Sequence, residues 1–255
     1  MASMTGKVAL ITGGTSGIGL ATALRFVEEG AQVAIAGRNV ERGEAALTQL
    51  KNAGGDAIFV PTDVSKAEDV ENLVNTVLST FGHLDFAFNN AAAPPATTSM
   101  GPITDLTEDQ WDTTMNVNLK GMWLSMKYEI PVLLQNGGGV IINTSSTAGG
   151  KAMPGMGAYV ASKHGLNGLT KSAALEYAEA GIRINVIMPG PVATPMMEQA
   201  SAVIPNADEA FVAQTAVKRI GQPQEIADAV IWLCSDAASF VTGASIPVDG
   251  GMLEA

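Results

Sequence analysis

The chain alternates short apolar segments with longer segments of helical periodicity along nearly its whole length. Seven apolar segments are expected to be strands, at residues 7–11, 32–36, 57–60, 84–88, 139–143, 183–187 and 245–248. Six segments are expected to be helices, at residues 18–29, 40–51, 66–81, 108–135, 157–180 and 224–236. Strands that are apolar on both faces are typical of a parallel sheet covered by helices. The pattern therefore predicts an α/β fold with a doubly wound parallel sheet of about seven strands, in three α/β/α layers.

Composition narrows the kinds of partner. No linker or change of composition divides the chain, so we expect one domain over residues 1–255. The formal net charge of −11 disfavours nucleic acid and anionic membrane surfaces. No apolar run reaches the ~20 residues that span a bilayer, and no signal-peptide pattern is visible, so we expect a cytoplasmic protein. No Cys/His or carboxylate cluster suggests a metal, and Cys234 is expected to be a buried, inert thiol.

One segment, at about 194–222, departs from the regular alternation. It is rich in Met, Pro, Ala and Asn, and it follows the sixth expected strand at the carboxyl edge of the sheet. Ligands of open α/β sheets bind at that edge. We therefore expect a lid over the substrate, with a plain surface excursion as the alternative.

A glycine-rich turn joins the first strand to the first helix. Gly13 permits a tight turn, Gly17 lets the backbone approach a pyrophosphate, and Gly19 lets the helix pack closely. The N-terminus of the helix would then present free N–H groups and a partial positive charge to phosphates. The turn therefore predicts a Rossmann-like dinucleotide site, and the alternative is a glycine-rich turn without a ligand.

Three polar side chains after the fifth strand suggest acid–base chemistry. Tyr159 and Lys163 are four residues apart, so they share one face of a helix. A neighbouring ammonium would lower the pKa of a phenol, which is ordinarily ~10. Ser146, just past the strand end, can bond a substrate oxygen on which charge develops. A Tyr-x-x-x-Lys pair alone is usually a packed aromatic beside a snorkelling lysine, so the case depends on the combination with the glycine turn.

The combination resembles the short-chain dehydrogenase/reductase family. The turn Thr12-Gly13-x-x-x-Gly17-x-Gly19 has the spacing of that family rather than the common Gly-x-Gly-x-x-Gly, and the likeness runs from Lys7 to about Gly251. Ser146, Tyr159 and Lys163 match its catalytic residues. The resemblance implies that Asn118 is the fourth, holding a water that relays protons from Lys163. It also implies a homotetramer.

Further segments match the family in detail. Asn89-Asn90-Ala91-Ala92 is similar to its Asn-Asn-Ala-Gly, with Ala92 in place of the glycine, and Asp63 is implied to contact the adenine. A helix cap is the alternative role of Asp63. The backbone of Val192 and the hydroxyl of Thr194 are implied to bond the nicotinamide carboxamide. The complete expected cofactor set is Gly13, Thr15, Ser16, Gly17, Ile18, Gly19, Arg38, Asn39, Asp63, Val64, Asn90, Ala91, Tyr159, Lys163, Pro189, Gly190, Val192 and Thr194.

The end of the second strand favours NADP over NAD. A carboxylate there would pair with the ribose 2′-hydroxyl and repel a 2′-phosphate, but this strand ends Ala36-Gly37-Arg38-Asn39. Arg38 offers a forked donor that suits a phosphate. Ser16 departs from the subgroup of the family that places a second basic residue in the glycine turn. NADP is therefore the preferred cofactor, with NAD kept open.

The expected substrate is a hydrophobic ketone or secondary alcohol. Methionine is over-represented among the residues expected to line its pocket, which makes that pocket apolar and adaptable. The expected lining is Ala93, Ser146, Thr147, Met153, Met156, Pro191, Met196 and Met197. One alternative is a protein of the same fold that senses the dinucleotide, or acts as a scaffold, without turnover. A dehalogenase-like enzyme with no dinucleotide would need a disrupted glycine turn, and this turn is intact.

Overall fold

The computed structural model describes residues 4–95, 100–203 and 206–255. Within them, seven parallel strands form one sheet in the order β3-β2-β1-β4-β5-β6-β7. The strands are β1 (Val8–Thr12), β2 (Gln32–Gly37), β3 (Ala57–Pro61), β4 (Phe86–Asn89), β5 (Gly139–Thr144), β6 (Ile182–Pro189) and β7 (Ser245–Val248). The predicted doubly wound sheet is thus confirmed. The strand order reverses between β1 and β4, which makes a topological switch point of the kind where ligands bind.

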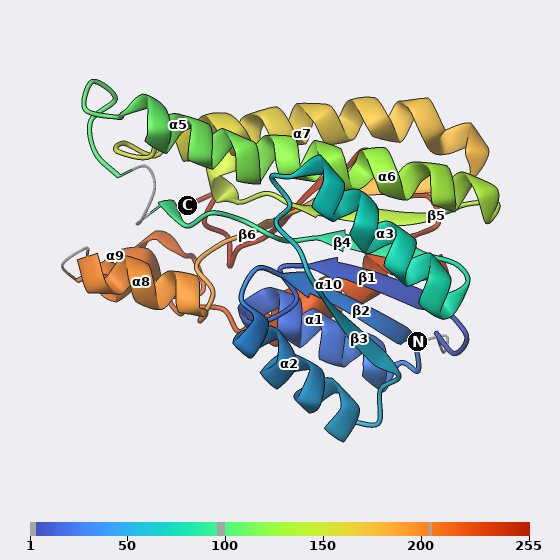
Figure 1. Ribbon diagram of the computed structural model, residues 1–255. Coiled ribbons are helices and arrows are strands. Elements are labelled where there is room, and N and C mark those ends of the chain that lie inside the picture. The colour runs from blue at the N-terminus through green and yellow to red at the C-terminus, as the bar shows by residue number, and fades with distance from the viewer. Residues whose placement is uncertain (1–3, 96–99, 204–205) are drawn as a thin grey trace.

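Helices cover both faces of the sheet (Figure 1). On one face lie α1 (Gly17–Glu28), α2 (Val40–Asn52) and α10 (Pro223–Cys234). On the other lie α3 (Ala67–Phe81), α6 (Gly121–Gln135) and α7 (Gly157–Tyr177). Each face has its own apolar core, with Phe26, Ile35 and Ile231 in one and Leu73, Leu133 and Ile184 in the other. Both faces of the strands are buried under helices. A ligand can therefore contact the sheet at the ends of the strands.

The long helix expected over residues 108–135 is interrupted. It consists of α5 (Glu108–Met115), a π-helical turn (Asn116–Lys120) and α6. A π-helical turn inserts into α-helices frequently at functional sites. This interruption could not be predicted, because residues 116–120 have an ordinary helical composition.

The segment expected to be irregular contains two short helices. These are α8 (Pro195–Val203) and α9 (Ala207–Gln214), which lie together beyond the carboxyl edge of the sheet (Figure 1). Residues 204 and 205 of the expected lid lie outside the described residues. The base of the segment is fixed by backbone pairing, since Gly221 N donates to Pro191 O at 2.9 Å and Ala193 N donates to Gly221 O at 2.9 Å. The segment is therefore a small helical unit tied to the sheet at its base.

Candidate active site

The glycine turn after β1 adopts a conformation that larger residues disfavour. Gly17, the first residue of α1, has a φ of +53°, in the left-handed region. A Cβ on Gly19 would lie 2.1 Å from the carbonyl oxygen of Gly13 and 2.8 Å from Nδ2 of Asn90. Gly19 therefore allows α1 to pack closely against its own N-terminal turn and against the residue that follows β4. This contact is closer than the packing of the helix that the sequence predicted. The hydroxyl of Ser16 does not cap the helix.

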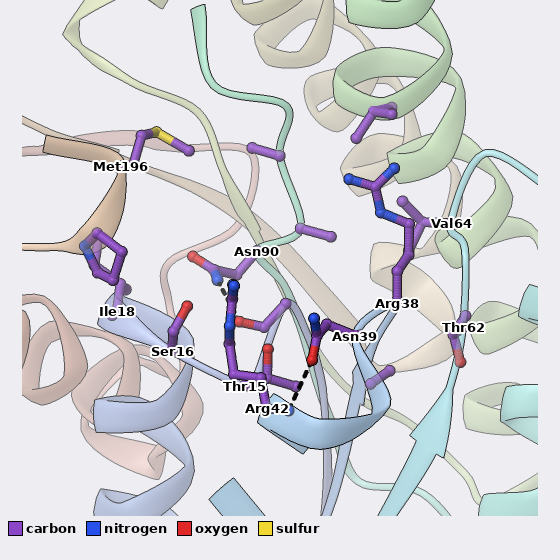
Figure 2. Close-up of a pocket in the computed structure, with 18 of the residues that line it drawn as sticks. Thr15, Ser16, Ile18, Arg38, Asn39, Arg42, Thr62, Val64, Asn90 and Met196 are labelled. Atoms are coloured by element: carbon purple, nitrogen blue, oxygen red, sulfur yellow. Dashed lines mark hydrogen bonds between the residues drawn. The ribbon is translucent and has the colours of Figure 1, made fainter. Parts of the chain in front are cut away.

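A cavity of about 610 Å³ opens at this turn, along the carboxyl ends of the first strands (Figure 2). Twelve of the residues expected to hold the cofactor line it: Gly13, Thr15, Ser16, Gly17, Ile18, Arg38, Asn39, Asp63, Val64, Asn90, Ala91 and Thr194. Gly19 does not line it, because it lies behind the turn. The N-terminus of α1 forms part of the cavity wall. The wall extends from the residues after β1 to the residues after β3. Glycine backbone at a helix N-terminus suits a pyrophosphate.

Two arginines mark the end of the cavity beside α2. Arg38 follows β2, and Arg42 lies one turn further on, in the first turn of α2 (Figure 2). Asn39 caps that helix, because its Oδ1 accepts a hydrogen bond from the backbone N–H of Arg42 at 2.8 Å. In the part of the chain that the structure describes, no ion pair involves either arginine. Both guanidinium groups can therefore serve a ligand. Sequence reasoning missed Arg42, although its spacing of four from Arg38 was a usable signal.

Asp63 lines the same cavity, close enough to Arg38 for the charge of the arginine to act on it. Its Oδ1 accepts hydrogen bonds from Oγ of Ser65 at 2.7 Å and from the backbone N–H of Ser65 at 3.1 Å. Burial alone would raise the pKa of Asp63, but these hydrogen bonds and the charges of Arg38 and Lys66 hold it below its usual range. Lys66 occupies the N-cap position of α3. Asp63 therefore closes a local turn rather than capping the helix, and it presents a carboxylate to the cavity.

A smaller cavity of about 180 Å³ adjoins the first one. The two share Ile18, Asn90, Ala92, Thr194 and Met196 in their walls. All the residues expected in the substrate pocket line the smaller cavity except Ala93, together with Pro189, Gly190 and Val192 from the expected cofactor set. Sequence reasoning missed Pro95, Ala200, Phe211 and Met252. Five methionines thus surround this cavity: Met153, Met156, Met196, Met197 and Met252.

The placement of Ala93 in the substrate pocket was wrong. Its side chain is 3% exposed and packs with Val64, Val117 and Leu124 in a separate apolar cluster. The neighbouring residues Ala92 and Pro95 face the cavity instead. Ala91 and Ala92 line the larger cavity whereas Ala93 packs into the apolar cluster, and the sequence did not show which residue of this segment would be buried.

Ser146, Tyr159 and Lys163 line the smaller cavity together. Ser146 follows β5, where its Oγ accepts from the backbone N–H of Ala148 at 3.1 Å, and it hydrogen-bonds the hydroxyl of Tyr159. Tyr159 and Lys163 lie one turn apart on α7, with Nζ of Lys163 5.6 Å from the centre of the Tyr159 ring. Nζ also donates to the carbonyl oxygen of Thr144 at 2.8 Å. The three residues are therefore held in fixed positions beside the smaller cavity.

The electrostatics of this group differ from the expectation. Burial raises the pKa of the Tyr159 phenol, and the hydrogen bond from Ser146 opposes that shift. Burial also lowers the pKa of Lys163 to about 7, so only part of the lysine population is charged at neutral pH. The expected lowering of the phenol pKa by Lys163 was wrong for the protein alone, because spacing along a helix carries no information on desolvation.

Asn118 lies in the π-helical turn and is fully buried. Its Oδ1 accepts from the backbone N–H of Ala93 at 2.7 Å. The side chain thus holds the segment that follows β4, and it lines neither cavity. Its catalytic role as the holder of a water stays a prediction.

The segment after β6, which was expected to contact the nicotinamide, is arranged around Thr194. Its hydroxyl donates to the carbonyl oxygen of Val192 at 3.2 Å and accepts from the backbone N–H of Met197 at 3.3 Å. Thr194 lines both cavities, whereas Val192 lines the smaller one. Both residues lie where a ligand that bridges the two cavities would pass.

Three further observations concern a metal site, a membrane-spanning helix and the cysteine. Within the described ranges, no group of three or more His, Cys, Asp or Glu side chains is placed to hold a metal ion. Of the helices that the structure describes, none has the length and apolarity to cross a membrane. Burial raises the pKa of the Cys234 thiol to about 12, which leaves it protonated and a poor nucleophile.

Comparisons with known proteins agree with this geometry. The profile of a family described as enoyl-(acyl carrier protein) reductase matches residues 13–253. A short-chain dehydrogenase/reductase of Aspergillus oryzae is 43% identical, over 98% of this chain and 96% of its own length. Cyclohexanol dehydrogenase of an Acinetobacter species is 41% identical, over 96% of this chain and 94% of its own.

Solved structures give the same result. A polyketide ketoreductase bound to NADPH superposes with a TM-score of 0.92 at 34% identity, covering 100% of both chains. A xylitol dehydrogenase bound to NAD⁺ superposes with a TM-score of 0.91 at 33% identity, covering 97% of this chain and 99% of its own.

Proposed function

The chain belongs to the short-chain dehydrogenase/reductase family and is a nicotinamide-dependent oxidoreductase, and from that premise we propose that it interconverts small hydrophobic ketones and secondary alcohols with a preference for NADP. The observation that carries the proposal is the continuity of the two cavities. The larger one begins at a glycine turn suited to a pyrophosphate, and the smaller one ends at Ser146, Tyr159 and Lys163. A dinucleotide in the first would place its reactive end beside the second.

The residues present fit such a cofactor. Gly17 keeps the wall free of a Cβ at the helix N-terminus, and Arg38 and Arg42 supply two cations at the far end. Asn90 and Thr194 line the passage between the cavities. When bound, the nicotinamide dinucleotide supplies or accepts a hydride.

The protein's own groups would move the proton. In the direction of reduction, the hydroxyl of Tyr159 donates its proton to the ketone oxygen, so one phenol O–H bond breaks and one alcohol O–H bond forms. The hydroxyl of Ser146 steadies the same oxygen as charge develops on it. The phenolate left on Tyr159 is favoured by its hydrogen bond with Ser146.

The preference for NADP rests on the arginine pair. A 2′-phosphate on the adenosine ribose would meet Arg38, Arg42 or both, and charge-assisted hydrogen bonds from a guanidinium are among the stronger ones. Asp63, which lines the same cavity, would contact the adenine. NAD stays the alternative cofactor.

The substrate class follows from the walls of the smaller cavity. Five methionines and Phe211 make it apolar and adaptable, and about 180 Å³ is room for a small ring or a short branched chain. We propose that residues 194–222 are a lid, because α8 and α9 supply Met196, Met197, Ala200 and Phe211 to this wall. A cyclic ketone such as cyclohexanone is the first substrate to test.

The proposal extends to assembly and location. We propose that residues 1–255 form a single domain. We also propose a homotetramer, because apolar side chains are exposed on the long helices: Trp111 on α5 is 40% exposed, Trp123 on α6 is 44% exposed and Leu175 on α7 is 79% exposed. Light scattering at micromolar concentration tests the tetramer, and a monomer would contradict it. A cytoplasmic location is proposed as well, and cell fractionation tests it.

The experiment for the activity is an initial-rate panel. Cyclohexanone, larger ketones and the matching alcohols are assayed with NADPH or NADP⁺ and with NADH or NAD⁺. Tyr159→Phe should lower kcat by about 10²–10⁴-fold, whereas Tyr177→Phe, at the other end of the same helix, should not change it. Tight dinucleotide binding with no turnover of any carbonyl would favour a sensing or scaffold protein instead.

A further inference from the structure

A buried hydrogen-bond network lies beside the active site and takes no direct part in the proton transfer from Tyr159. Its carboxyl group is Glu129 on α6, which is 1% exposed. Nδ2 of Asn89 donates to Oε2 of Glu129 at 2.9 Å and to Oδ1 of Asn143 at 3.1 Å. Nδ2 of Asn143 donates in turn to Oγ1 of Thr170 at 2.9 Å. The network therefore ties two helices, α6 and α7, to the ends of two neighbouring strands, β4 and β5.

The residues that follow the two asparagines belong to the active site. Asn90, after Asn89, lines both cavities and donates to the carbonyl oxygen of Gly13 at 3.3 Å. Thr144, after Asn143, supplies the carbonyl oxygen that holds Nζ of Lys163 at 2.8 Å. A shift of either strand end would move a wall of the cofactor cavity or the anchor of the lysine.

Burying a carboxyl group at this position costs free energy. Its helix neighbours Ile130 and Leu133 are buried apolar residues, and no ion pair of Glu129 occurs in the described part of the chain. Burying an unpaired carboxylate is far more expensive than burying an alkyl side chain. An apolar residue would fill the space at lower cost, so packing alone does not account for Glu129.

A protonated carboxyl group would complete the hydrogen bonds of this network. Burial raises the pKa of Glu129 to about 7, against the opposing effect of the Asn89 hydrogen bond, so the group is largely protonated below neutral pH. Oδ1 of Asn89 has no hydrogen-bond partner among the described residues. The network is thus short of one donor, and a protonated carboxyl group carries one. Fully satisfied buried networks fix a unique arrangement of the elements that they join.

We propose that Glu129 is a positioning residue, which holds Asn89 and Asn143 so that the ends of β4 and β5 present Asn90 and the Thr144 carbonyl group in the geometry that catalysis needs. It acts through these residues and touches neither cavity. The inference rests on the proposed function, because the effect of Glu129 on catalysis is measured as the rate of the reaction that Tyr159 and Lys163 support. Small errors of placement in an active site cost rate out of proportion to their size.

The test compares two replacements of Glu129 with a matched control. Glu129→Leu removes the hydrogen-bonding group and should lower kcat about tenfold, with the KM values for cyclohexanone and NADPH within about twofold of the wild type. Glu129→Gln can accept from Asn89 and donate as well, so it should restore kcat to within about twofold. Ser125→Ala is the control, because Ser125 is buried one turn earlier on α6 and bonds only its own helix, donating to the Gly121 carbonyl oxygen at 3.0 Å.

Backbone hydrogen exchange gives a readout that does not need turnover. Amides at residues 89–91 and 143–146 should exchange about tenfold faster in Glu129→Leu than in Glu129→Gln or Ser125→Ala. If the wild type reduces no ketone, the proposed function fails, and the exchange rates still decide whether Glu129 orders the strand ends. Unchanged kcat and unchanged exchange in a folded Glu129→Leu would overturn the inference.

A second variant covers the case in which Glu129→Leu does not fold. Thr170→Val keeps the shape of the side chain but removes the hydroxyl that accepts from Asn143, at the far end of the network. We expect kcat to fall about threefold and the amides at residues 143–146 to exchange faster. Wild-type values for both quantities in this variant would overturn the inference equally.

Discussion

The larger cavity is shaped mainly by backbone at strand ends and a helix N-terminus, whereas the smaller cavity is shaped by flexible side chains. Gly13, Gly17 and the residues after β2 and β3 form the cofactor side, and their positions follow from the sheet. The substrate side is formed by methionines from the loop before α7, from α8 and from the C-terminal tail. The difference suggests that the cofactor contacts a rigid wall, whereas the ketone contacts a wall of flexible side chains that can change without disturbing the sheet.

The largest expected effect tests the rigidity of the cofactor side. Gly19→Ala would place a Cβ 2.1 Å from the Gly13 carbonyl oxygen, so the turn must move. Overpacking of this kind costs roughly 3 kcal/mol or more, and we expect NADPH affinity to fall more than about a hundredfold. Fluorescence titration measures the affinity and thermal melting checks the fold.

The matched control is Gly168→Ala on α7. A Cβ there meets no atom within 4 Å, and the residue is exposed inside a helix. Alanine should stabilise the helix by about 0.5–1 kcal/mol and leave NADPH binding unchanged. A Gly19→Ala protein that binds NADPH as the wild type does would show that the cofactor wall is as adaptable as the substrate wall.

The next prediction concerns the pH dependence of the free energy of unfolding that Glu129 introduces beside the cofactor cavity. The pKa of Glu129 is raised to about 7 in the folded protein from an ordinary value of 4.5. The folded protein therefore binds a proton more tightly than the unfolded chain does, and the stability from this group is full below pH 4.5 and is lost as pH rises through 7. Gln cannot titrate, so Glu129→Gln should gain about 2–3 kcal/mol relative to the wild type between pH 5 and pH 8.

Chemical denaturation of both proteins at the two pH values measures this difference. The lowered pKa of Lys163 also makes stability pH-dependent, but Lys163 is present in both proteins and its contribution cancels in the comparison. A difference in unfolding free energy that stays constant from pH 5 to pH 8 would mean that Glu129 is ionised throughout.

A third effect probes the charged end of the rigid cavity. Arg38→Asp replaces a cation by an anion beside the position proposed for the 2′-phosphate, so the ratio of kcat/KM for NADPH to that for NADH should fall about fiftyfold. Arg42→Gln, one turn further along α2, should lower the same ratio by a smaller factor, because it removes a charge without adding the opposite one. Full NADPH preference in Arg38→Asp would refute the assignment of this end.

The same contrast explains what could be predicted from sequence. The strands and the glycine turn follow from apolar periodicity and local spacing, because each of them lies within one or two adjacent segments. The trio of Ser146, Tyr159 and Lys163 was selected by its combination with that turn and by the family resemblance, since the spacing of Tyr159 and Lys163 alone is common. Phe211 and Met252 were missed because they reach the smaller cavity from distant segments with no local signal. The burial of Ala93 and the raised pKa of Tyr159 depend on what packs around each side chain, which spacing does not contain.

The smallest effect concerns the adaptable wall itself. Phe211→Ala removes an aromatic ring from the lid side of the smaller cavity, so the KM for cyclohexanone should rise about tenfold, a change typical of one lost apolar contact. A bicyclic ketone should lose less or gain, because the cavity is larger, and NADPH affinity should stay within twofold because Phe211 does not line the cofactor cavity. Phe240→Ala, which changes a fully exposed ring, is the control. If NADPH affinity fell as much as the affinity for the ketone, the two walls would be coupled, and the substrate side could not vary independently of the cofactor side.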